Sequence, residues 1–105
     1  MERVAFCLRL RDGTGDSYDE AHRKVWPEML TLLKDAGVSD YSIFRRDELV
    51  VLSMRVENFE QTWDRIEQSP VNTRWQQAMA EFFAPMVSLR PGERFPTMRE
   101  VFYME

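Results

Sequence analysis

Three ring-bearing side chains, Tyr18, His22 and Trp26, follow one another at intervals of four residues in the first third of the sequence. Residues four apart lie on the same side of an α-helix. An imidazole can donate or accept a proton near neutral pH, because histidine titrates at about 6.5. A phenol one turn away can orient a hydroxyl, and an indole offers a flat apolar surface with one donor. The set therefore predicts a small-molecule site with acid–base chemistry at His22.

A purely structural interpretation competes with this one. His22 shares an apolar stripe with Val25, Met29 and Leu32, and a single histidine on such a face is more often a hydrogen-bonded core residue than a catalyst. The spacing alone favours the core interpretation. Tyr18 moves the balance toward function, because two polar groups in one buried stripe both require partners.

Four other residues have patterns that fit either packing or binding. Tyr41 opens an expected strand, and Trp63 and Trp75 lie on the apolar faces of expected helices. Such aromatic residues usually belong to a core. Gln76, which follows Trp75, is typical of a surface position.

The composition limits the class of protein. The 105 residues suffice for one domain, which we expect to span residues 1–105. The formal net charge is −4. Nucleic-acid binding is driven largely by positive side chains that displace counterions from the phosphates, and an acidic protein lacks this gain, so we exclude nucleic acid as a partner. No apolar run approaches the ~20 residues of a membrane span, and the first residues do not resemble a secretory signal. We expect a cytoplasmic protein that does not bind a membrane.

The cysteine and histidine counts restrict the metal and disulfide chemistry. The sequence has one cysteine, Cys7, and one histidine. An internal disulfide is therefore impossible, and a closed zinc site of cysteine and histidine ligands cannot form. Cys7 alternates with arginines and lacks the neighbours that activate a thiol.

The first half of the chain alternates between strand and helix patterns. Residues 4–11 have the two-residue period of a strand, and residues 17–36 have a helical period that Pro27 should kink near Trp26. Thr14 or Asp16 is expected to cap this helix, and Gly37 to end it. Residues 41–44 and 49–56 then form two strands, joined by a turn at 46–48.

The second half contains two shorter helices and a last strand. Asn58 with Gln61 resembles a helix-capping pair, and Ser69-Pro70 is a typical helix start. Residues 84–97, with three prolines, are expected to form a loop, and loops of this length often cover a site. Residues 98–104 are expected to form the last strand.

This order of elements predicts an α+β fold of the ferredoxin-like, split βαβ type with an antiparallel sheet. Helices would cover one face of the sheet. The strand 49–56 is apolar on both sides, with Leu49 and Val51 on one and Val50 and Leu52 on the other. An exposed apolar sheet face usually marks an interface. We therefore expect a homodimer whose sheets pack face to face as a dimeric α/β barrel.

The segment from Tyr18 to Glu28 carries a resemblance to a known family. It is similar to the signature Y-x-x-x-H-x-x-x-W-P-E of the L-rhamnose mutarotase family. The similarity extends over essentially the whole chain, with further matches at Gly37, residues 40–43, Trp63, residues 74–75 and residues 100–103. Three ring-bearing residues at fixed spacing, followed by Pro-Glu, make the first motif specific.

The resemblance implies an isomerase that interconverts the α and β anomers of L-rhamnose or a related 6-deoxyhexose, as a homodimer with no cofactor and no metal. It implies that His22 is the proton donor and that Tyr18 and Tyr41 hold sugar hydroxyls. Trp63, Trp75 and Gln76 are expected to complete the binding site for the monosaccharide. The family has a Trp-Trp pair where this sequence has Trp75-Gln76, so the preferred sugar stays open.

Two alternatives accompany this expectation, because a fold does not fix a function. The same dimeric plan is similar to that of cofactor-free monooxygenases acting on haem or polycyclic phenols. A non-enzymatic sugar-binding or regulatory module is the other. It would bind sugars without speeding the exchange of their anomers.

Overall fold

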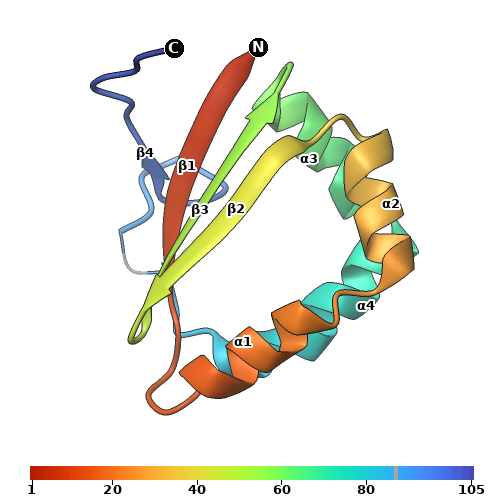
Figure 1. Ribbon diagram of the computed structural model, residues 1–105, viewed down its shortest axis with the longest axis vertical. Coiled ribbons are helices and arrows are strands. Elements are labelled where there is room, and N and C mark those ends of the chain that lie inside the picture. Colours follow the sequence, from red (N-terminus) through yellow and green to blue (C-terminus); the bar gives the residue numbers. More distant parts are fainter. Residues whose placement is uncertain (87) are drawn as a thin grey trace.

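The computed structural model describes residues 1–86 and 88–105. It has two layers, a β-sheet and a layer of α-helices that covers one face of the sheet (Figure 1). In chain order the elements are β1 (Glu2–Arg9), α1 (Gly15–Arg23), α2 (Pro27–Asp35), β2 (Ser39–Arg46), β3 (Leu49–Val56), α3 (Phe59–Glu67), α4 (Pro70–Met79), a 3₁₀ turn (Ala80–Phe82) and β4 (Thr97–Met98). No helix in these residues is long and apolar enough to cross a membrane.

The sheet has the antiparallel order β2-β3-β1-β4, which confirms the split βαβ plan. The four α-helices all lie on one of its faces (Figure 1). Strand alternation decides which side chains meet them. Phe6 pairs with Leu52 in the β1–β3 ladder, and both are buried under the helices with Val50 and Ile66.

The prediction of one kinked helix over residues 17–36 is wrong, because the chain leaves helical geometry between Arg23 and Pro27. Pro27 has no N–H for the helix and disfavours helical backbone in the residue before it. Trp26 accordingly has the extended angles φ −59° and ψ 134°. The segment becomes two helices, and Trp26 no longer shares a helix with His22.

The helix ends follow the sequence with one exception. The Asn58 side chain accepts a hydrogen bond from the Gln61 N–H, and the Ser69 hydroxyl accepts one from the Val71 N–H. Gly37 ends α2 with φ +97°, a conformation that glycine adopts without strain. The exception is Thr14, which makes no side-chain cap and instead donates its hydroxyl to the carbonyls of Arg11 and Phe82.

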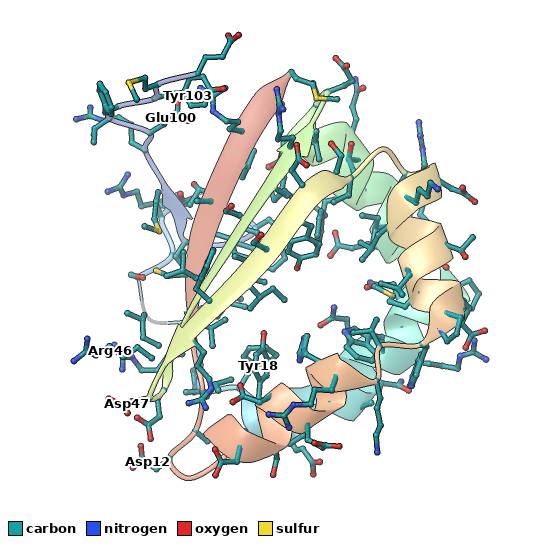
Figure 2. All side chains as sticks on the ribbon, in the orientation of Figure 1. Asp12, Tyr18, Arg46, Asp47, Glu100 and Tyr103 are labelled. Carbon is teal, nitrogen blue, oxygen red and sulfur yellow. The ribbon has the colours of Figure 1, made fainter. Side chains whose placement is uncertain are left out.

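The last strand is much shorter than residues 98–104, the range that the sequence predicts. β4 comprises only Thr97 and Met98, which pair with Phe6 and Ala5. The tail beyond it is held by side chains rather than by a backbone ladder: Arg3 forms an ion pair with Glu100 at 2.7 Å and lies over the ring of Tyr103 (Figure 2). The expected loop 84–97 precedes β4, and its residue Val87 lies outside the described residues.

Candidate active site

A two-lobed cavity lies between the inner face of the sheet and the helices. The first lobe has a volume of about 280 Å³ and the second about 300 Å³. The first lobe brings together all six residues that the sequence singles out: Tyr18, His22, Tyr41, Trp63, Trp75 and Gln76. All of them except Tyr18 also line the second lobe. Figure 2 shows Tyr18 pointing from α1 into the space between helices and sheet.

His22 is half-buried and lines both lobes. Its Nδ1 lies 2.8 Å from the carbonyl oxygen of Tyr18, one turn earlier in α1. A carbonyl only accepts hydrogen bonds, so Nδ1 must carry the hydrogen. This bond fixes the tautomer and leaves Nε2 as the nitrogen that can exchange a proton with a ligand.

The two tyrosines of the cavity stay protonated over the whole neutral range. Burial raises the pKa of Tyr18 to about 12, with a smaller contribution from the negative charge of Asp19. Burial also raises the pKa of Tyr41, and Tyr18 adds to that shift. Both phenols are therefore hydrogen-bond donors at neutral pH, which suits them to hold sugar hydroxyls.

Indole rings form one wall of the cavity. Trp75 from α4 meets the ring of His22 edge to face at 5.6 Å and the ring of Trp26 at 5.1 Å. Trp26 therefore supports the wall from behind and is absent from the lining of the cavity. Trp63 packs on Phe6 and Phe95, so it is both a core residue and a lining residue.

A bidentate ion pair fixes α1 against the sheet. Arg45 on β2 donates from Nε and Nη2 to the two carboxylate oxygens of Asp19, at 2.7 and 2.6 Å. These hydrogen bonds lower the pKa of Asp19. No local signal links two residues that are 26 positions apart.

Gly15 gives Arg45 the room to make this contact. A Cβ at Gly15 would lie 2.4 Å from Nη1 of Arg45 and 2.8 Å from its Cζ. Real Cβ atoms essentially never approach other atoms that closely. The absence of a side chain at Gly15 thus allows the Arg45–Asp19 pair to form, and this pair holds the helix that carries Tyr18 and His22.

The cavity also contains Asn72, a residue that sequence reasoning missed. Asn72 is 5% exposed and lines the second lobe. Its Oδ1 accepts a hydrogen bond of 3.3 Å from Nε2 of Gln76, one turn further along α4. The four-residue spacing of two amides was a visible signal, since it places them on the same side of a helix.

Residues of the expected loop form part of the cavity wall. Ala84, Pro85, Met86 and Phe95 line the first lobe. Arg94 holds this segment to α3, because its guanidinium contacts Asp64 at 2.5 Å, Glu60 at 3.2 Å and Glu67. The expectation that this loop covers a site agrees with these contacts.

The cavity offers no arrangement typical of a metal centre. In the described part of the chain, no three side chains of the types His, Cys, Asp or Glu lie close enough together to hold a metal ion. What the cavity holds is one imidazole with a fixed tautomer, two protonated phenols, indole surfaces and a pair of amides. That set can exchange protons with, and hydrogen-bond to, a polyhydroxylated ring.

Comparisons with known proteins agree on one family. The family model described as L-rhamnose mutarotase matches residues 3–104. An L-rhamnose mutarotase from Formosa agariphila is 36% identical over 109 residues, with all of both chains covered. One from Sinorhizobium fredii is 37% identical over 94 residues, covering 87% of this chain and 88% of the relative.

Solved structures give the same fold. The crystal structure of an L-rhamnose mutarotase from Formosa agariphila superposes with a TM-score of 0.77 at 31% identity, covering all of both chains. Tetracenomycin F2 cyclase from Streptomyces glaucescens superposes with a TM-score of 0.68 at 17% identity, covering all of this chain and 97% of the cyclase. At that identity the cyclase shares the fold alone.

Proposed function

The chain belongs to the L-rhamnose mutarotase family, and on that premise we propose that it interconverts the α and β anomers of L-rhamnose or a related 6-deoxyhexose at His22. One observation carries the proposal: the only histidine has one ring nitrogen tied to a carbonyl and the other left for a ligand, in a cavity with two protonated phenols. Such a site needs neither a metal nor a cofactor to move a proton.

The reaction is a balanced exchange of protons on the sugar. Protonated His22 gives the Nε2 proton to the ring oxygen as the bond from that oxygen to the anomeric carbon breaks. The anomeric hydroxyl becomes the aldehyde and returns its proton to Nε2. Rotation about the bond between the first two carbons presents the other face of the aldehyde, and the reverse steps close the ring. His22 ends in the state in which it began.

The other cavity residues have distinct roles in this proposal. Tyr18 and Tyr41 donate hydrogen bonds to sugar hydroxyls, since both phenols keep their protons at neutral pH. The indole of Trp75 provides a flat surface for the C–H groups of the sugar. Its contact with the His22 ring keeps the bound sugar close to Nε2.

The test is the rate of anomer exchange, measured by saturation-difference NMR on L-rhamnose with and without protein. We expect faster exchange with the native chain and a loss of about 10²–10⁴-fold in His22→Gln, the usual contribution of one positioned acid–base group. Lys24→Gln is the matched control, because Lys24 is exposed and outside the cavity. Unchanged exchange for every sugar tested would contradict the proposal, and sugar binding without exchange would support a binding module instead.

We further propose that two copies pair through the outer face of the sheet. That face carries small and apolar side chains, among them Ala5, Cys7 and Val51, and Phe44 is 65% exposed on it. Exposed apolar patches of this kind usually mark an interface. Light scattering should give the mass of a dimer for the native chain and of a monomer for Val51→Lys. A native monomer at micromolar concentration would refute the pairing.

We also propose that the protein works in the cytoplasm. Cys7 is free and is the only cysteine of the sequence, so the fold does not require an oxidising compartment. Fractionation of cells that express the tagged chain tests this location. Recovery in the membrane or secreted fraction would contradict it.

A further inference from the structure

We infer that Trp26, which lies outside the cavity, is a positioning residue that holds the indole of Trp75 against the imidazole of His22. The inference rests on the proposed function, because it concerns the wall against which the sugar binds. Three observations carry it: the arrangement of the rings, the flexible packing around Trp75, and the fixed backbone of Trp26 at the start of α2.

The rings of Trp26, Trp75 and His22 form a continuous series that runs from outside the cavity to the imidazole. The centroids of Trp26 and Trp75 lie 5.1 Å apart at an interplanar angle of 86°, and those of Trp75 and His22 lie 5.6 Å apart at 85°. Both contacts have the edge-to-face arrangement that the charge distribution of aromatic rings favours. A change at Trp26 therefore reaches the cavity through Trp75.

The other surroundings of Trp75 give its indole little rigid support. One side of the residue borders open space, since Trp75 lines both lobes of the cavity. Its buried neighbours in the same core cluster are Met29 and Met79, and methionine side chains adapt to the shape around them. Within the described residues, His22 and Trp26 are the only aromatic rings that meet the ring of Trp75. Trp26 is thus the contact that keeps the indole from moving away from the cavity.

The backbone of Trp26 is fixed by the residues that follow it. Pro27 keeps Trp26 in the extended geometry described above. The carbonyl oxygen of Trp26 accepts hydrogen bonds from the N–H groups of Met29 and Leu30, at 3.0 and 3.1 Å. Trp26 is therefore anchored at the start of α2 and can act as a stop for the indole of Trp75.

An ion pair is a second link between the start of α2 and α4. Arg74, the neighbour of Trp75, donates from Nη2 to the carboxylate of Glu28 at 3.4 Å. The two side chains are 58% and 56% exposed, and exposed ion pairs contribute little. The ring contact of Trp26 should therefore dominate, and Arg74 provides a matched control that breaks only the other link.

Loss of the Trp26 ring should weaken sugar binding and leave proton transfer intact. His22 is oriented within its own helix, by the hydrogen bond between its Nδ1 and the carbonyl oxygen of Tyr18. Trp75, in contrast, is supported from behind, so its indole turns away from the C–H groups of the sugar when that support is lost. An interaction lost equally from the ground state and the transition state raises KM and leaves kcat unchanged.

The experiment compares Trp26→Leu with Trp26→Phe in the anomer exchange of L-rhamnose, measured by saturation-difference NMR. Both substitutions shorten an apolar side chain, but only phenylalanine keeps a ring for the indole of Trp75. We expect KM to rise by up to about tenfold in Trp26→Leu, the upper contribution of one aromatic pair, with kcat unchanged. KM should stay near its native value in Trp26→Phe and in the control Arg74→Gln.

Circular dichroism tests the ring contact without reference to activity. Two indoles 5.1 Å apart couple their electronic transitions and give a pair of bands of opposite sign in the far ultraviolet. We expect this pair of bands in the native chain and in Arg74→Gln, and its loss in Trp26→Phe. Its absence from the native chain would overturn the inference, even if Trp26→Leu does not fold.

The kinetic outcomes separate this inference from the proposed function. Native KM in Trp26→Leu, equal rises in Trp26→Leu and Trp26→Phe, a fall of kcat alone, or an equal rise in Arg74→Gln would each overturn the positioning role and leave the mutarotase proposal standing. No faster exchange with the native chain would overturn the proposed function. Calorimetric titration of L-rhamnose into the same variants then decides the positioning role, and a native chain that does not bind this sugar would overturn both.

Discussion

Replacing Gly15 by alanine should lower the activity without lowering the stability of the fold. The added Cβ would lie 2.4 Å from Nη1 of Arg45, about 1 Å short of the ordinary contact distance of 3.4 Å. Arg45 must therefore retreat by about 1 Å. Its bonds to Asp19, at 2.6 and 2.7 Å, cannot lengthen that much and remain hydrogen bonds. Either α1 follows Arg45 or the ion pair breaks.

The size of the effect follows from what α1 carries. Tyr18 and His22 both lie on this helix, and a misplacement of about 1 Å can cost up to about 100-fold in rate. We expect kcat for anomer exchange to fall between about 10- and 100-fold. The helix itself should gain, because alanine in a helix is favoured over glycine by up to about 1 kcal/mol.

Exchange NMR and thermal unfolding of the same samples measure both effects. Ser17→Ala is the matched control, since it changes an exposed residue of the same helical turn. In the Arg45→Met background the substitution of Gly15 should cost nothing further, because the clashing group is gone. Full activity of Gly15→Ala, or additive losses in the double variant, would refute the reasoning.

Four further outcomes follow from the cavity and its wall. Tyr18→Phe should raise KM more than it lowers kcat in the exchange assay, since it removes a hydroxyl-binding group and spares the imidazole. The contribution of Tyr18 to the unfolding free energy should be constant below pH 10 and fall between about pH 10 and 12, because its phenol ionises near 10 when unfolded but holds its proton to about 12 when folded. Denaturant titrations over this range should show a shallower fall in Tyr18→Phe. Trp75→Ala should cost about 3–5 kcal/mol in the same titrations, the usual cost of truncating a buried aromatic residue. Arg94→Met should raise KM with little change in the exchange assay's kcat, because it releases the segment next to Phe95 that lines the first lobe.

Much of the fold is local enough to be predicted. The two-residue period of residues 49–56 predicts which of their side chains share a face, and Val50 and Leu52 lie together on the helix side. Asn58, Ser69 and Gly37 mark helix ends through interactions that span only a few residues. The tail beyond Met98 could not be predicted in this way, because an edge strand exists only where a neighbour offers a backbone ladder.

The sequence by itself determined the fold class and, through the family resemblance, singled out six of the residues that line the first lobe. Tyr18 and His22 are one helical turn apart, so their proximity follows from helical geometry alone. The tertiary structure decided how α1 docks on the sheet, through Arg45 and Asp19, and that Asn72 reaches the cavity. Those features depend on the angles and distances between whole elements. Such angles result from the packing of many side chains at once, and no short stretch of sequence contains them.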